Sequence, residues 1–243
     1  MPERLNPIAA YDHIAPVFAQ VAAQRKAYLD AIDALVISGV PPGSRSLLDV
    51  GAGDGLRSCR IAQAAGLSDL TLLEPSVEMR RRWPPGPRAL TIPAEDLSSI
   101  AGQFDVITCL WNVLGHILPA ANRAEALYQF ARLVSHRGKI FIDVNHRYNV
   151  ARYGALPTFA RIVHDSIFPS DRNGDVSVTW NVFGIRCSTI GHVFTHQEFC
   201  RMIESAGLAI DKQYVVDYVS GELRLRRFEG NLLYVLRRKS DAE

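Results

Sequence analysis

Cysteine is scarce in this chain of 243 residues, and the four cysteines that it has lie far apart. They are Cys59, Cys109, Cys187 and Cys200, and no Cys-x-x-Cys pair occurs among them. This spacing suggests neither a zinc site nor a disulfide framework. We therefore expect reduced thiols in a cytoplasmic protein, and we predict no metal site.

Long hydrophobic runs and an excess of one charge are also missing. No segment approaches the length that spans a membrane, and the N-terminal residues lack the apolar core of a signal peptide. The formal net charge of +2 gives no support for an obligate polyanionic partner. We expect neither nucleic acid nor a membrane as partner, and leave a homodimer open.

The remaining composition is that of a globular protein. Hydrophobic residues make up 48% of the chain and charged residues 21%, which is ordinary for a soluble fold. A chain of this length suits one α/β domain with an insertion, or at most two small domains.

The most informative stretch is glycine-rich and runs from Leu47 to Ser58. An apolar run leads into Gly51, Gly53 and Gly55, and a helix-compatible sequence follows at once, which predicts a strand, a tight turn and a helix. Glycine lets the backbone turn sharply and lie flat against a ligand. The spacing departs from the Gly-x-Gly-x-x-Gly of dinucleotide sites and therefore fits NAD poorly.

Two segments that end in acidic residues follow. Residues 68–74 predict a short strand that ends at Glu74, whose carboxylate can accept hydrogen bonds from both hydroxyls of a ribose. Pro75 and Ser76 then open a helix, with Ser76 suited to cap it. Residues 89–97 predict a further strand and an acidic turn that contains Glu95 and Asp96.

In this order and spacing, the three segments resemble the motifs of class I S-adenosylmethionine (SAM) dependent methyltransferases. The resemblance implies SAM as the cofactor and S-adenosyl-L-homocysteine as the product. It implies that Glu74 holds the ribose and that Glu95 or Asp96, with Glu95 preferred, binds the adenine amine. The segment from Tyr11 to Ala15 resembles one that closes over the cofactor, although a tyrosine that packs on its own helix is an equal alternative. The expected cofactor-binding residues are Tyr11, Asp49, Gly51, Ala52, Gly53, Glu74, Pro75, Ala94, Glu95, Asp96, Leu110 and Trp111.

The segment from Trp111 to Ile117 follows a predicted central strand, at the end where α/β folds bind ligands. It resembles the Asn-x-x-x-His loop of small-molecule N-methyltransferases and lacks the Asn/Asp-Pro-Pro-aromatic motif of enzymes that methylate base amino groups. We predict His116 as a general base or substrate-orienting group, because imidazole takes a proton near neutral pH. The alternative is a histidine that caps a helix or bonds a backbone carbonyl. Asn112, also placed in the catalytic set, holds either the substrate or the loop itself.

A second polar cluster follows the strand predicted over residues 138–145. Beyond it, residues 151–195 predict an antiparallel insertion that covers the site, with strands over 160–168 and 176–187 and a third that runs to Phe194. For any one residue of the insertion, packing on a sheet face is the more ordinary role. The expected substrate-binding residues are Asn145, His146, Arg147, Tyr148, Trp180 and His192, with Arg147 suited to a carboxylate or phosphate.

Together these features predict a Rossmann-like α/β fold with a seven-stranded, mostly parallel sheet and helices on both faces. The expected parts are an N-terminal helical cap (residues 1–45), a SAM-binding core (46–150), the β-rich insertion after the fifth strand (151–195) and the rest of the core sheet (196–243). The expected function is SAM-dependent methylation of a small molecule, with N-methylation of an amine slightly favoured over O-methylation. RNA modification, supported only by the arginines at 80–82 and 224–227, and SAM binding without catalysis are the alternatives.

Overall fold

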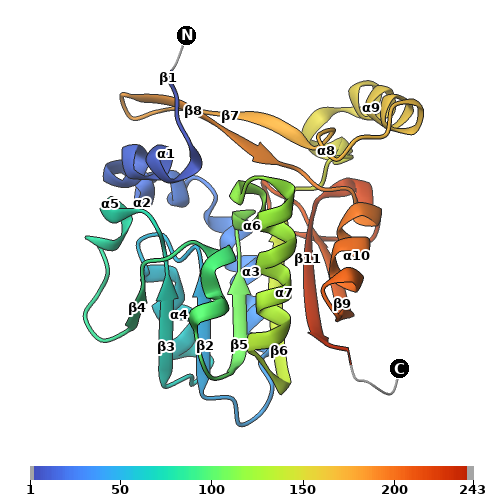
Figure 1. The fold of residues 1–243 in the computed structure, drawn as a ribbon. Coiled ribbons are helices and arrows are strands. Elements are labelled where there is room, and N and C mark those ends of the chain that lie inside the picture. The colour runs from blue at the N-terminus through green and yellow to red at the C-terminus, as the bar shows by residue number, and fades with distance from the viewer. Residues whose placement is uncertain (1–2, 240–243) are drawn as a thin grey trace.

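An eight-stranded sheet runs through the centre of the molecule (Figure 1) in a computed structural model that describes residues 3–239. The strand order is β10-β9-β11-β6-β5-β2-β3-β4. From β2 to β6 neighbouring strands are parallel, whereas β11 is antiparallel to both β6 and β9. The strands are β2 (Ser46–Val50), β3 (Asp69–Leu73), β4 (Arg88–Leu90), β5 (Phe104–Cys109), β6 (Val134–Val144), β9 (Leu208–Val216), β10 (Leu223–Arg224) and β11 (Asn231–Arg238). The predicted architecture is confirmed, and the two-residue β10 makes eight strands where seven were expected.

Helices cover both faces of the sheet. On one face, α3 (Lys26–Gly39) and α4 (Leu56–Ala64) contribute Tyr28, Ile32 and Ile61 to a buried apolar cluster. On the other, α7 (Ala120–Leu133) and α10 (His196–Ser205) contribute Phe130 and Phe199. Because both faces are buried, the central strands are apolar along most of their length, as parallel sheets require.

Short elements precede the sheet and connect its strands. Two helices were predicted ahead of the first sheet strand, but the segment is divided further, because Pro16 lacks the backbone N–H that a continuous helix would need. Asn6 caps α1 by accepting a hydrogen bond from the Ala9 N–H at 2.8 Å. These elements are β1 (Glu3–Arg4), α1 (Pro7–Ile14), η1 (Ala15–Val17), α2 (Phe18–Ala23), α5 (Val77–Arg80), η2 (Ala94–Ser99), α6 (Val113–His116), α8 (Val150–Tyr153) and η3 (Arg227–Glu229).

The insertion after β6 corrects two predictions. Residues 160–168 are not a strand, since α9 (Ala155–Ile167) occupies them, and its large apolar residues recur at helical spacing. The strand predicted over 176–187 is divided into β7 (Asp175–Val182) and β8 (Ile185–His192). Phe183 and Gly184 make the turn with positive φ angles of 49° and 83°. A Phe-Gly pair is not among the Asn-Gly and Asp-Gly pairs that signal such a turn.

The order of the parallel strands fixes where a ligand can bind. The chain goes from β2 outward to β3 and β4, then crosses back to place β5 on the other side of β2. The loops after β2 and β5 therefore diverge at the carboxyl ends of these strands, which leaves a crevice. The antiparallel hairpin of β7 and β8 lies above this edge of the sheet (Figure 1). None of the helices within residues 3–239 is long and apolar enough to cross a membrane.

Candidate active site

A cavity of about 710 Å³ lies at the carboxyl ends of the central strands, and its size suits a nucleoside-sized ligand together with a second small molecule. Most residues predicted to bind the cofactor, together with His116, line it. They are Tyr11, Asp49, Gly51, Ala52, Gly53, Glu74, Pro75, Ala94, Glu95, Leu110, Trp111 and His116. Asp96 does not line this cavity and its side chain is exposed on η2.

The glycine turn between β2 and α4 packs closely against neighbouring side chains. Gly51 has a φ of 75°, and a Cβ atom there would lie 2.4 Å from a methyl group of Val113. Gly53 has a φ of 56°, and its Cβ would meet the Phe18 ring at 3.1 Å. The indole N–H of Trp83 donates to the Gly53 carbonyl at 2.8 Å and so fixes the turn from outside. Only glycine satisfies both the backbone angles and the close packing.

Glu74 is buried where β3 ends. Its Oε2 accepts a hydrogen bond from the Gly53 N–H at 3.0 Å, and its Oε1 accepts one from the Ser76 N–H at 2.9 Å. Burial raises the pKa of this carboxyl group to about 7, against the lowering effect of the two N–H donors. Each carboxylate oxygen keeps a second lone pair, so the group can still accept hydrogen bonds from a ligand in the cavity.

Asp49 connects three elements beneath the cavity. It accepts a hydrogen bond from the Ser58 hydroxyl on α4 and another from the Thr108 hydroxyl on β5 at 2.6 Å. Burial raises its pKa above the ordinary aspartate range. On the opposite wall, an oxygen of Glu95 accepts a hydrogen bond from the Asn122 side chain at 2.5 Å, which orients that carboxylate beside the cavity.

The loop after β5 has an uncommon backbone conformation. Trp111 and Asn112 have φ angles of 60° and 59°, in the left-handed region that non-glycine residues rarely adopt. The buried carboxylate of Asp143 accepts hydrogen bonds from the Trp111 N–H and from the Tyr28 hydroxyl, the latter at 2.6 Å. This pairing holds Trp111 against the cavity. A strained loop that surrounding groups hold in this way is typical of functional sites.

Asn112 is turned away from the cavity and holds the loop. Its side-chain oxygen accepts a hydrogen bond from the Asn145 N–H at 2.9 Å, and its amide donates to the His192 carbonyl at 3.2 Å. The side chain therefore joins the ends of β6 and β8 to the loop. Two roles were predicted for Asn112, which are holding the substrate and holding the loop. Its side chain contacts the neighbours of the loop and does not line the cavity.

His116 is enclosed by aromatic side chains at the other end of the cavity. Its ring lies 5.4 Å from that of Tyr11, edge to face, and 6.3 Å from the indole of Trp180 on β7. Burial lowers the pKa of His116 to about 4, although a hydrogen bond with the Ile190 backbone opposes the shift, so the imidazole is neutral at pH 7. Its Nδ1 has no hydrogen-bond partner among residues 3–239.

The predicted substrate-binding cluster after β6 does not line this cavity. Arg147 makes two hydrogen bonds to the Asp165 carboxylate, at 2.5 and 2.8 Å, and Tyr148 donates to the same group at 2.8 Å. Asn145 accepts a hydrogen bond from the Asn231 amide at 2.8 Å. Through these contacts, Arg147 and Tyr148 bind α9 and Asn145 binds the start of β11. None of the three residues lines the cavity.

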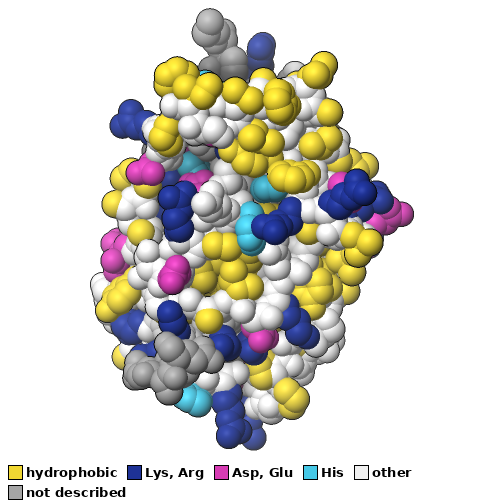
Figure 2. All heavy atoms as spheres, turned by 90° about the vertical axis from the view of Figure 1, so that its right-hand side faces the viewer, with side chains coloured by type: hydrophobic (Ala, Val, Ile, Leu, Met, Phe, Trp, Pro, Cys, Tyr) yellow, Lys and Arg dark blue, Asp and Glu magenta, His cyan; other side chains and the backbone are white. Residues whose placement is uncertain are grey.

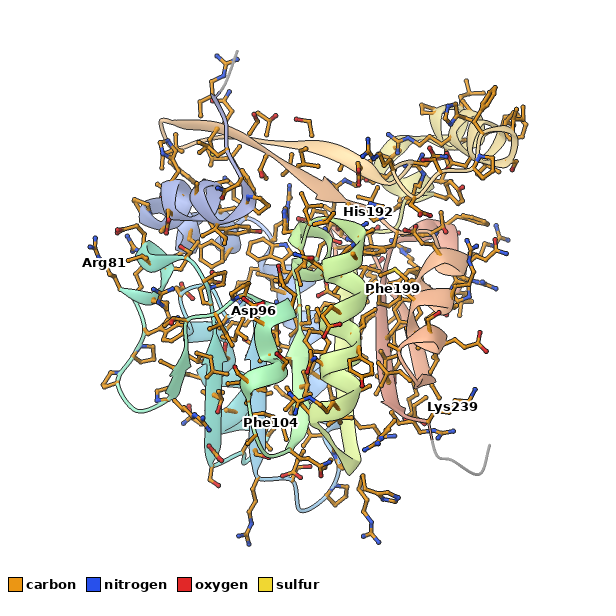
Figure 3. All side chains as sticks on the ribbon, viewed as in Figure 1. Arg81, Asp96, Phe104, His192, Phe199 and Lys239 are labelled. Atoms are coloured by element: carbon orange, nitrogen blue, oxygen red, sulfur yellow. The ribbon has the colours of Figure 1, made fainter. Side chains whose placement is uncertain are left out.

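The two remaining predicted histidines are also enclosed by protein. His146 is buried with its ring stacked on Phe228 at 5.9 Å. His192 lies at the end of β8 (Figure 3), where its two ring nitrogens are each 2.7 Å from a carboxylate oxygen, one of Asp175 and one of Glu198. Of the predicted substrate-binding residues, only Trp180 reaches the aromatic group around His116.

Several cavity residues come from the N-terminal helices and were missed by the sequence analysis. Phe18 and Ala22 on α2, and Lys26 and Asp30 on α3, also line the cavity. Arg57 also reaches the cavity, and its Nε donates to Asp33 at 2.6 Å. The amphipathic pattern of residues 17–36 marked these helices but could not show that part of their surface faces a ligand site.

Comparisons with known proteins give a consistent family and fold. The family model described as a methyltransferase domain matches residues 21–213. The structure is similar to that of the methyltransferase CcbJ from Streptomyces caelestis, with a TM-score of 0.70 and 14% identity, over 97% of this chain and 100% of that one.

Two further solved structures have the same fold. The sugar N-methyltransferase KedS8 from a Streptoalloteichus species has a TM-score of 0.61 and 17% identity, over 92% of this chain and 93% of that one. The amino pentose methyltransferase CalS10 from Micromonospora echinaspora, solved with SAM bound, has a TM-score of 0.61 and 17% identity, over 92% and 97% of the two chains. A comparison with curated proteins gives no significant match.

Proposed function

Because the chain belongs to the methyltransferase-domain family, we propose that it transfers a methyl group from SAM to the amine of a small molecule. The observation that carries the choice of an amine is the neutral, buried His116 within an aromatic enclosure at one end of the cavity.

The glycine turn and Glu74 fit SAM. Gly51, Ala52 and Gly53 of the turn line the cavity, and a flat ligand can lie close against the backbone of the two glycines. Glu74 presents a buried carboxylate at the end of β3, where it can accept hydrogen bonds from two ribose hydroxyls. Ala94 and Glu95 line the next part of the wall, and they would hold the adenine ring and its amine. When bound, SAM supplies an electrophilic methyl group on a sulfonium centre.

The acceptor end is apolar and aromatic. Tyr11 and His116 line the cavity there, and Trp180 closes the group from the hairpin. A dry enclosure of this kind disfavours an ammonium ion without a partner, so the bound amine loses its proton and gains a free lone pair. Aromatic faces also stabilise the positive charge that appears on nitrogen as methylation proceeds.

His116 can then orient the nucleophile. A neutral imidazole accepts a hydrogen bond from an amine N–H, which turns the nitrogen lone pair toward the methyl group. Bound SAM would supply the methyl group, and the lone pair that His116 orients would form the new N–C bond while the electrons of the broken S–C bond stay on sulfur. The methylated ammonium would then give up its N–H proton to solvent, because a histidine with a pKa of about 4 is a weak base. Tyr11 and Trp180 limit the positions the acceptor can take.

An acceptor assay tests the proposal. The purified protein is incubated with methyl-labelled SAM and pairs of compounds that differ only in carrying an amine or a hydroxyl at one carbon, beginning with amino sugars because KedS8 and CalS10 are described as acting on such compounds. We expect label in an amine and not in its hydroxyl counterpart. Transfer to hydroxyls alone would overturn N-methylation while leaving the cofactor intact. Calorimetry that detects no binding of SAM or its demethylated product would overturn the cofactor assignment.

A further inference from the structure

The helix α9 is attached to the rest of the protein by its polar side. Asp165 accepts the two hydrogen bonds from Arg147 and the one from Tyr148, and the ion pair is nearly buried on both sides. Arg161 packs over the ring of Tyr153 at 4.2 Å and so faces α8. Thr158 is the one buried residue of this 13-residue helix, and its hydroxyl donates to the Gly154 carbonyl.

The opposite side of α9 is apolar and faces outward. Its exposed fractions are 83% for Leu156, 67% for Phe159, 39% for Val163 and 61% for Ile167, and Phe168 directly after the helix is 63% exposed. We refer to these five side chains as the apolar face of α9. Hydrophobic side chains gather over α9 at the top of the surface in Figure 2. The arrangement is the reverse of a normal surface helix, whose apolar side faces the core.

We infer that the apolar face of α9 binds the same face of a second copy of the chain and forms a two-fold symmetric dimer. The spacing of the residues fits antiparallel helices that cross at Val163. Phe159 and Ile167 lie four positions before and after Val163, so each would meet the other on the second copy, as an isologous contact requires. Ala160 and Ser166 flank the stripe, and small side chains let two helices approach closely.

The exposed area of the apolar face of α9 is similar to the apolar area that one partner buries in the interface of a stable dimer. A large side chain carries on the order of 200 Å² of surface, so the exposed fractions above leave about 600 Å² of side-chain surface in water. A standard interface covers about 800 Å² on each partner, roughly 65% of it apolar in a homodimer. The face therefore supplies the apolar share, and polar groups beside it such as His164, which is also exposed, would form the rim.

The charges near α9 favour a second protein surface over a membrane. A helix that lies on a membrane carries lysine and arginine along its polar side, where they meet lipid headgroups. Here the polar side of α9 contains Arg161 and Asp165, and both are engaged with the protein beneath them. The five side chains of the apolar face are uncharged, so a second copy brings no like charges together.

Sedimentation velocity and light scattering on the full-length protein test the inference, with no ligand needed. We expect a species of twice the 26.9 kDa chain mass at concentrations of ~1–100 µM. Phe159→Glu should raise the dimer dissociation constant by at least about tenfold, because it buries a charge in the interface. Leu225→Glu is the matched control, since Leu225 is 101% exposed but lies between β10 and η3, outside the apolar face. This control should leave the dimer intact.

Circular dichroism melting of each variant separates a lost interface from a lost fold, and Val163→Glu gives a second substitution at the symmetry axis. A wild-type protein that stays monomeric at ~100 µM would overturn the inference. A dimer that survives both Phe159→Glu and Val163→Glu would also overturn it, because another surface would then hold the copies together. Flotation of a monomeric wild type with phosphatidylcholine and phosphatidylserine vesicles would identify a membrane as the partner instead.

Discussion

At the scale of single residues, the proposed role of Glu74 would link the ionisation of the protein to cofactor binding. Its pKa is raised to about 7 by burial, so half of the ligand-free protein carries a neutral carboxylic acid at that pH. Only the carboxylate offers acceptors for two ribose hydroxyls at once. If Glu74 holds the ribose as proposed, SAM binding favours deprotonation, and we expect the affinity to decrease as the pH falls below 7.

We predict that SAM affinity decreases between pH 8 and pH 6, with a slope that approaches about tenfold per pH unit below the pKa. Glu74→Gln keeps the shape of the side chain but has no charge to lose. This variant should bind SAM more weakly at pH 8, by about 1–3 kcal/mol, and should lack the part of the slope that Glu74 causes. Titration calorimetry at several pH values measures both effects. Equal slopes in wild type and variant would show that another group titrates.

His116 should affect turnover more than cofactor affinity. Because its pKa is lowered to about 4, the imidazole stays neutral between pH 6 and 9 and can accept a hydrogen bond throughout that range. We predict that His116→Ala lowers kcat by about a hundredfold while the Kd for SAM changes little. His136→Ala, which alters an exposed histidine at the start of β6, is the control. Wild-type turnover in His116→Ala would remove this residue from the chemistry.

Sequence analysis correctly positioned the residues whose surroundings are formed by segments close to them in the sequence. Gly51 and Glu74 lie at ends of adjacent strands, and their geometry follows from the strand-turn pattern. Arg147 could not be placed, because its partner Asp165 lies on a helix that had been predicted as a strand. Asn112 depends on Asn145 and His192, which are 33 and 80 positions away. No local pattern contains such contacts.

At the scale of elements, the turn between β2 and α4 depends on the loop after β5. A Cβ on Gly51 would come 2.4 Å from Val113, which belongs to α6, whereas a Cβ on Gly43 would meet nothing within 4 Å. Both glycines have a φ near 80°, so alanine at either position suffers the same backbone penalty of about 1–2 kcal/mol. The two substitutions therefore differ mainly in the collision with Val113.

We predict that Gly51→Ala weakens SAM binding by at least about tenfold, because the turn or α6 must shift. Gly43→Ala should bind SAM as the wild type does, while its melting temperature decreases. Calorimetry and thermal melting on both variants make the comparison. If the two variants bound SAM equally well, contact between the β2 turn and α6 would have no part in shaping the site.

The elements were predicted with unequal success for a physical reason. The strands β2 and β3 are short apolar runs followed by Gly51 and Glu74, and α10 begins at a capping box formed by Thr195 and Glu198. The helix α9 lacks such signals, since β-branched and aromatic residues are common along it and its apolar side faces outward. A strand was predicted there because these residue types favour strands when no other contact is considered.

At the scale of the whole molecule, the cavity is formed by several separate segments of the first half of the chain, between residues 6 and 118. Residues from α1, α2, the β2 turn, the end of β3, η2 and the loop after β5 all line it. A ligand that bridges these parts binds the folded protein and not the unfolded chain. Saturating SAM, at about a hundred times its Kd, should therefore add about 2.7 kcal/mol to the free energy of unfolding.

Urea denaturation with and without SAM measures this stabilisation. Gly51→Ala is the control, because it should show a smaller gain at the same SAM concentration. Stabilisation of Gly51→Ala equal to that of the wild type would place the ligand somewhere other than the cavity beside the β2 turn.

The position of β11 also has a consequence for biosynthesis. This strand comes after all the other strands in the sequence, yet it lies between β6 and β9 and pairs with both, and residues 231–236 are buried. While a ribosome is still making residues 134–230, the edge of β6 that β11 will cover has no partner, and an open edge is prone to pair with other chains. Synthesis at ~5–20 residues per second leaves that edge exposed for several seconds. The nascent chain is thus most in need of a chaperone before Asn231–Arg238 emerge.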